Sequence, residues 1–189
     1  MSDQPSAERG GRLRSHIAWW LGTVSALIGI AAFFLTQCQS TAPSFDDWKT
    51  KANAVCEKEV PGIYHEMQGA ADSLRALNER LESDPESVTQ DDIDATAAEM
   101  REIDILTRNL VGSWRELEQP DERKKDLEKL YEAGVATSDA SGALAQSIHD
   151  NDWKKVDGDA TAGEKAQKDW SNQVKNLDLK QCNALFETL

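Results

Sequence analysis

The feature that most constrains the fold is an apolar repeat in the first half of the chain, with alternating steps of three and four residues. The repeat covers three heptads and consists of Val60, Ile63, Met67, Ala70, Leu74, Leu77 and Leu81. Because an α-helix has about 3.6 residues per turn, this spacing places all these side chains on one helical face. The sequence therefore predicts an amphipathic helix that buries this face.

The limits of this helix are predicted from its capping residues and prolines. Ser44 is the expected N-cap, because acidic residues follow it in the first turn, where negative charge is favourable. Pro61 has no backbone N–H group and its ring clashes with the preceding turn, so we expect a break or kink between residues 57 and 61. The stretch ESDPES (82–87) is expected to end the helix.

A second helix is predicted after Thr89, the expected N-cap, which Asp92 follows three positions later. Val88 is placed to contact Ile93 as a hydrophobic staple. The predicted inner face consists of Ile93, Ala97, Met100, Ile103, Leu106 or Thr107, Leu110, Trp114 and Leu117.

Two further helices are predicted in the C-terminal half. Pro120 suits the first position of the third helix, whose inner face has small residues in its middle that favour close approach to a neighbour. The fourth helix is expected to follow HDND (149–152) and to be weakened by Gly158 and Gly163. The inner face of this fourth helix is predicted to be Trp153, Val156, Ala160, Gly163, Trp170, Val174 and Leu177.

These four segments predict an all-α fold. Amphipathic helices of roughly 25–35 residues with short links are typical of an antiparallel four-helix bundle, here over residues 45–189. No segment alternates apolar and polar residues as a strand does, and an aromatic content of 6% is low for an all-β domain.

The three cysteines are expected to differ in role. Cys56 lies near the start of the first helix and Cys182 just after the fourth, and in an antiparallel bundle with an even number of helices both places are at the same end. We therefore predict a Cys56–Cys182 disulfide, with two buried free thiols as the alternative. Cys38 is then left without a partner in the chain.

An uncharged apolar run, Ile17–Leu35, precedes the predicted bundle. Its nineteen residues are close to the roughly 20 that a helix needs to cross a bilayer. We predict a transmembrane signal anchor over residues 17–37, with Trp19 and Trp20 in the aromatic belt at one interface. The segment 1–16 is then a short cytoplasmic tail and 38–44 a linker.

The orientation of this anchor is predicted from its flanking charges. Arg9, Arg12 and Arg14 lie upstream of it, whereas the first basic residue downstream is Lys49. By the positive-inside rule the N-terminus is cytoplasmic and the bundle extracytoplasmic, in a compartment that permits disulfides.

A lipoprotein is the alternative to this anchor, because Leu35 lies three positions before Cys38, as in bacterial lipoprotein signals. Gln37 is bulky where such signals carry a small residue, which disfavours lipidation of Cys38. A free thiol, or a disulfide to a second copy of the chain, is the remaining option for this cysteine.

Composition limits the function. The formal net charge of −13 disfavours binding to nucleic acid or to anionic lipid. The three histidines, His16, His65 and His149, lack a second histidine or cysteine at metal-ligand spacing, and no phosphate loop or nucleophile elbow occurs. The sequence predicts no catalytic, cofactor or metal site.

Four short motifs suggest a relationship: WKTKANAVC (48–56), WRELEQP (114–120), HDNDW (149–153) and LDLKQC (177–182). Their order resembles a functionally uncharacterised family of actinobacterial extracytoplasmic proteins, over most of residues 45–185. The resemblance implies a helical bundle, anchorage by lipid or by one helix, and pairing of the two flanking cysteines. It implies no activity.

We therefore expect a non-catalytic, membrane-tethered interaction or binding module, whose partner is an envelope protein or a small ligand. The alternative is a ligand-sensing input domain that acts through a membrane partner, since four-helix bundles bind small molecules between their helices.

Overall fold

The computed structural model describes residues 42–186, and these are almost entirely helical. Four long helices are present: α2 (Phe45–Ser83), α3 (Gln90–Glu116), α4 (Lys124–His149) and α5 (Trp153–Asn176). Two short 3₁₀-helices, η1 (Pro85–Ser87) and η2 (Lys180–Leu185), complete this part of the chain, which contains no strand. The all-helical class with four long helices is confirmed.

The predicted tail, anchor and most of the predicted linker precede this part of the chain. Within residues 42–186, no helix combines the length and the apolar character that a membrane crossing requires.

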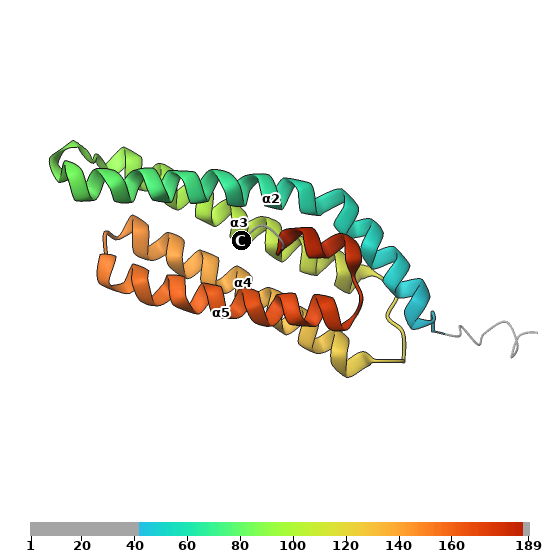
Figure 1. Ribbon diagram of the computed structural model, residues 1–189. Coiled ribbons are helices and arrows are strands. Elements are labelled where there is room, and N and C mark those ends of the chain that lie inside the picture. Colours follow the sequence, from blue (N-terminus) through green and yellow to red (C-terminus); the bar gives the residue numbers. More distant parts are fainter. Residues whose placement is uncertain (1–41, 187–189) are drawn as a thin grey trace, which may run out of the picture. The chain divides into compact units, whose positions relative to one another are not determined.

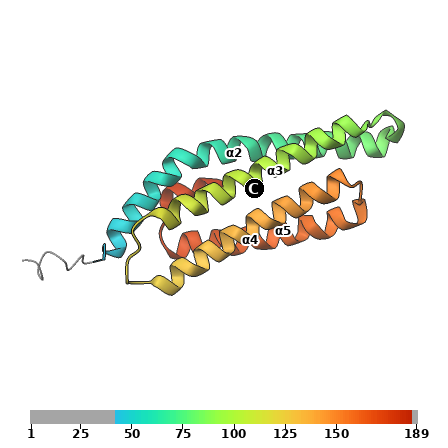
Figure 2. The same ribbon diagram turned by 180° about the vertical axis from the view of Figure 1, so that it is seen from behind.

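Consecutive helices pack against each other in alternating directions, but the bundle is not closed. α2 packs against α3, α3 against α4, and α4 against α5, whereas α2 and α5 do not approach one another (Figure 1, Figure 2). η2 turns back from the end of α5 and packs against both α2 and α5. The bundle therefore has one open side, which η2 covers only at the end near the start of α2.

The predicted helix starts are confirmed where side chains cap them. Ser44 Oγ accepts a hydrogen bond from the Asp47 N–H at 3.2 Å, and Asp152 caps α5 through the Lys155 N–H. Thr89 and Asp92 form a reciprocal capping box at the start of α3. These local contacts satisfy backbone N–H groups that lack helical partners.

Of the break or kink expected near Pro61, the break does not occur, because α2 runs uninterrupted through this residue over its whole length of 39 residues. Pro61 is exposed while its neighbours Val60 and Ile63 are buried in the core, so packing on the inner face holds the helix together. Figure 1 shows α2 bending between its blue and its green part. A bend without interruption agrees with the loss of one hydrogen bond at a proline.

The start predicted for the third helix at Pro120 is wrong, since α4 begins at Lys124. Pro120 is buried in the α3–α4 loop, where the Gln119 side chain donates hydrogen bonds to the carbonyls of Leu117 and Trp114 at 2.6 and 3.0 Å. Arg123 then adopts a left-handed conformation with φ 57°. Because of this loop, α4 begins about one turn later than predicted.

The core consists of two separate clusters. The first, near the start of α2 and the end of α5, is centred on Trp48, Trp114 and Trp170 and contains both disulfide cysteines. The second, near the α2–α3 and α4–α5 loops, includes Leu77, Ile93 and Ile148. Met67 is only partly buried and contacts both clusters. The middle of the bundle is thus less densely filled than its ends.

The predicted disulfide is present and belongs to the first cluster. Cys56 on α2 and Cys182 on η2 are bonded, with their Cα atoms 5.2 Å apart and no exposed surface on either residue. The bond fixes η2 to α2 across the open side of the bundle.

Candidate binding groove between α2 and α5

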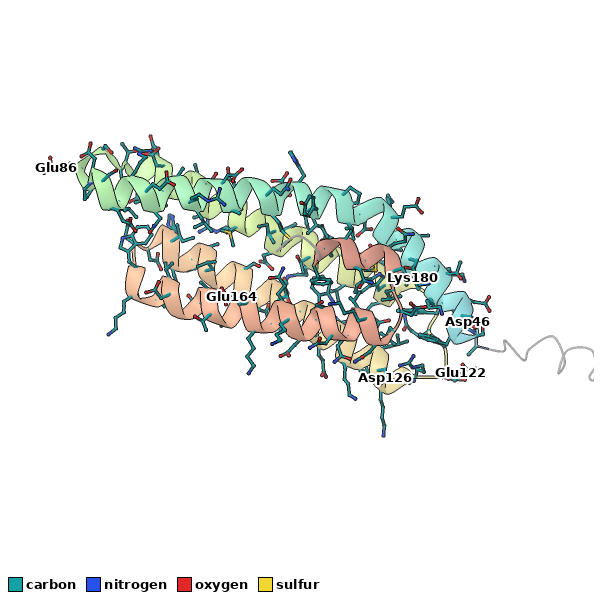
Figure 3. All side chains as sticks on the ribbon, in the orientation of Figure 1. Asp46, Glu86, Glu122, Asp126, Glu164 and Lys180 are labelled. Atoms are coloured by element: carbon teal, nitrogen blue, oxygen red, sulfur yellow. A yellow bond between two sulfur atoms is a disulfide. The ribbon has the colours of Figure 1, made fainter. Side chains whose placement is uncertain are left out.

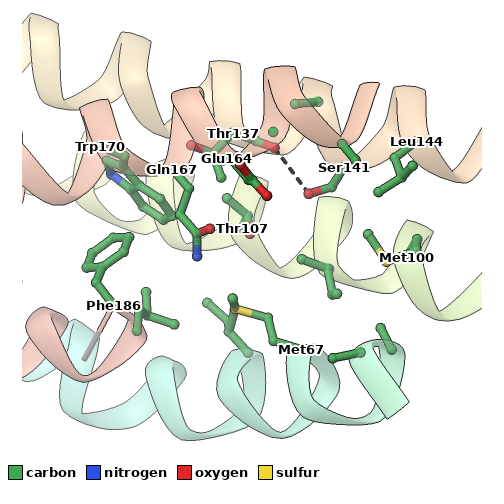
Figure 4. A pocket seen from close by; sticks show the side chains of 18 of the residues that line it. Met67, Met100, Thr107, Thr137, Ser141, Leu144, Glu164, Gln167, Trp170 and Phe186 are labelled. Carbon is green, nitrogen blue, oxygen red and sulfur yellow. Dashed lines mark hydrogen bonds between the residues drawn. The ribbon is translucent and has the colours of Figure 1, made fainter. Parts of the chain in front are cut away.

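A cavity of about 240 Å³ lies between the two clusters, where the bundle is open. Figure 4 shows this space from close by, with α2 on one side and α4 and α5 on the other. All four long helices and η2 contribute to its lining. We refer to this cavity, lined by residues 63–74 of α2, 100–107 of α3, 137–144 of α4, 160–170 of α5 and 185–186, as the α2–α5 groove.

The groove exists because the facing side chains of α4 and α5 are small. Ala140 and Ser141 of α4 and Ala160 and Gly163 of α5 all line the groove. A methyl group placed at Gly163 would meet the Ala140 Cβ at 4.0 Å, an ordinary contact distance. With α4 and α5 so closely packed, α5 stays away from α2, and the groove remains between them.

One end of the groove is aromatic. Trp170 of α5 and Phe186 close this end, with ring centroids 5.4 Å apart and an interplanar angle of 84° (Figure 4). Phe186 follows η2 directly, so the disulfide at Cys182 holds this ring in place. The aromatic wall thus depends on the covalent link between η2 and α2.

The opposite end is apolar. Leu74, Met100, Leu144 and Ala160 line it, each from a different long helix. Met100 belongs to the second cluster, and Leu74 and Leu144 pack against it. A ligand in the groove would therefore meet hydrocarbon at one end and aromatic rings at the other.

Polar groups are few, and two of them, the hydroxyls of Thr137 and Ser141, are already satisfied by the backbone of α4. Thr137 Oγ1 donates to the Ala133 carbonyl at 3.0 Å, and Ser141 Oγ donates to the Thr137 carbonyl at 3.2 Å. Glu164, by contrast, takes part in none of the ion pairs formed within residues 42–186. Figure 3 places Glu164 on the middle turns of α5, and Figure 4 shows its carboxylate beside Gln167 in the groove.

Asp92, His65 and His149, which were considered from the sequence, lie outside the groove. Arg80 forms a two-fold contact with Asp92, at 2.9 and 3.0 Å, and this contact, together with the Thr89 hydroxyl and N–H, holds the pKa of that carboxyl well below its usual range. His149 Nδ1 lies 2.8 Å from Asp94 on the surface, and His65 is exposed. Within residues 42–186, no three His, Cys, Asp or Glu side chains are grouped to hold a metal ion.

Of the predicted site residues, Cys56 and Cys182 are brought together as expected. Ile17, Trp19, Trp20, Leu35 and Cys38 lie outside the described residues.

The groove itself was not predicted. The small residues on the predicted inner faces of the third and fourth helices are the signal that could have indicated an unfilled space between helices. No protein-family model, curated protein or solved structure matches the chain.

Proposed function

We propose that residues 42–186 form a non-catalytic binding module whose ligand site is the α2–α5 groove. The observation that carries this proposal is the open side of the bundle, which leaves an apolar cavity of about 240 Å³ between two packed clusters. Apolar concave sites with a few polar groups, formed between the helices of a bundle, are typical of small-molecule binding.

The module is proposed to be extracytoplasmic and held at the cell membrane by the segment Ile17–Leu35, with its N-terminus in the cytoplasm. Support comes from the uncharged run and the arginines before it. The Cys56–Cys182 disulfide supports the same location, because such bonds persist in oxidising compartments.

Two alternatives for the anchor concern Cys38. Lipidation of this cysteine would replace the transmembrane helix, and a disulfide to a second copy would make a homodimer. Intact mass of the membrane-extracted chain, before and after reduction and alkylation, separates these states. A diacylglyceryl mass with loss of residues 1–37 would show the lipoprotein form.

The groove also favours a second candidate, a ligand-sensing input domain that relays binding to a membrane partner. Both candidates need a ligand in the groove, so the same first experiment tests them.

That experiment measures thermal unfolding of the full chain in lipid nanodiscs with cyclohexanol, a small neutral probe. Ala160→Leu places a larger side chain inside the groove, and Ala136→Leu, at an exposed position of α4 that does not line the groove, is the matched control. A ligand at one hundred times its Kd stabilises the native state by about 2.7 kcal/mol. The probe is expected to raise the Tm of the wild type and of A136L but not of A160L. Equal Tm shifts in all three proteins, or no Tm shift in any of them, would contradict the proposal.

A further inference from the structure

The groove has a polarity along its length that indicates the chemical class of its ligand. Trp170, Gln167 and Glu164 follow one another on α5 from the aromatic end toward the middle of the groove, and Glu164 is exposed to solvent at this point. Beyond them lie Ser141 and then the apolar end formed by Leu74, Met100, Leu144 and Ala160 (Figure 4). Figure 4 shows the same order, with Trp170 and Phe186 at one side and Leu144 and Met100 at the other.

The half of the groove between its middle and its aromatic end contains two kinds of group that bind cations. The Glu164 carboxylate is negative and lacks an ion-pair partner among the residues the structure describes. The rings of Trp170 and Phe186 lie on the same side of the groove, and aromatic faces attract ammonium groups, quaternary ones included. A carboxylate together with aromatic rings therefore favours an ammonium group over a neutral or anionic head.

We propose that the groove binds a free, small cationic amphiphile: an ammonium head lies against Glu164, Trp170 and Phe186, and a short hydrocarbon tail extends toward Met100 and Leu144. This inference rests on the proposed function and adds the class of ligand to it. An apolar cavity of about 150 Å³ holds benzene, so this one accommodates on the order of ten non-hydrogen atoms. A phospholipid with two acyl chains is far larger than that.

The charge of the whole domain agrees with a cationic ligand. Residues 42–186 contain 31 acidic and 18 basic side chains, so their surface potential attracts cations and repels anionic amphiphiles such as fatty acids. The attraction falls with added salt, because exposed charges are screened.

The test uses probes of equal size and opposite charge. Hexyltrimethylammonium and hexanesulfonate each have six tail carbons and ten non-hydrogen atoms, and tetramethylammonium supplies the head without the tail. Binding of each to the full chain in nanodiscs is measured by isothermal titration calorimetry, with empty nanodiscs of the same lipid subtracted. Glu164→Gln removes the carboxylate charge, and Asp169→Asn, an exposed position on the same helix outside the groove, is the matched control.

The expected result is preferential binding of hexyltrimethylammonium over both other probes, with affinity reduced about tenfold in E164Q and unchanged in D169N. A160L should abolish binding of all three probes. Equal binding of the cation and the sulfonate, or equal loss in E164Q and D169N, overturns the ammonium assignment while leaving the groove as a binding site. If A160L binds hexyltrimethylammonium as the wild type does, the groove is not the site, and both this inference and the proposed function are wrong.

Discussion

Cys56 on α2 and Cys182 on η2 are joined by a disulfide across 126 residues of sequence, and both are fully buried in the cluster that contains Trp48, Trp114 and Trp170. The bond has two effects. It restricts the unfolded chain, and it fixes the segment that carries Leu185 and Phe186 against the open side of the bundle. Stability and the shape of the groove are thus linked through one covalent contact.

Removing this bond is expected to destabilise the domain strongly. In the chain-entropy model, a loop of this length contributes about 4–5 kcal/mol to the free energy of unfolding. The double variant Cys56→Ala and Cys182→Ala should show this loss in urea-induced unfolding, and reduction of the wild type should reproduce it. Cys38→Ala is the control and should have little effect. Unfolding curves that coincide for the double variant and the wild type would contradict the prediction.

Gly134 and Gly69 should respond in opposite directions to alanine. A Cβ at Gly134 would lie 2.5 Å from Val111 Cγ2 and 3.2 Å from the Trp170 ring, because α4 approaches α3 and α5 closely at this point. Gly69 has no atom within 4 Å of such a Cβ. Overpacking should lower the free energy of unfolding of Gly134→Ala by about 1–3 kcal/mol. Gly69→Ala should raise it by up to about 1 kcal/mol through helix propensity. Stabilisation by both substitutions would show that the α3–α4–α5 interface is looser than described.

The capping box of α3 predicts a specific acid sensitivity. The pKa of Asp92 is held down chiefly by Arg80, and further by Thr89. A carboxyl whose pKa is lowered by folding stabilises the native state above its unfolded pKa of about 3.9. That contribution is lost as the pH falls below this value toward the folded pKa. The free energy of unfolding should therefore decrease below about pH 4, and Asp92→Asn should remove part of this decrease.

Denaturant titrations at several pH values measure this effect. Asp91→Asn is the charge-matched control, because Asp91 is exposed on the first turn of the same helix. The same pH dependence in D92N and in the wild type would mean that the Arg80–Asp92 contact does not persist in solution.

The helices were predictable because their determinants are local. The heptad repeat from Val60 to Leu81, the N-caps Ser44 and Thr89, and the small residues around Gly134 each act within a few turns of helix. The disulfide was predictable from topology, since it needs only the number and direction of the helices.

The features that sequence alone did not indicate depend on tertiary packing. Pro61 predicts a break or kink in α2, and the helix bends without breaking (Figure 1) because burial of Val60 and Ile63 on the opposite face outweighs the lost hydrogen bond. Pro120 was assigned to a helix start, whereas its burial and the contacts of Gln119 place it in a loop. The open α2–α5 side depends on how closely α5 packs on α4, which periodicity does not specify.

Tyr131 should ionise only at unusually high pH. Its hydroxyl donates a hydrogen bond to Gln119 Oε1 at 2.7 Å, and burial raises the pKa of Tyr131 to about 12. A tyrosine in an unfolded chain ionises near pH 10, so the folded state holds this proton more tightly. The stability that it contributes is present below pH 10 and is lost as the pH rises from about 10 toward 12.

Ultraviolet titration of Tyr64→Phe isolates this group, because the chain has only two tyrosines. The remaining tyrosine should stay protonated at pH 11 while the near-ultraviolet circular dichroism is still native, and its ionisation should accompany unfolding. Tyr131→Phe should reduce the loss of stability between pH 10 and 12, although it leaves Gln119 without the hydroxyl as a donor. Ionisation near pH 10 in the folded protein would show that water reaches the α3–α4 loop at Gln119, and that the loop which delays the start of α4 is open in solution.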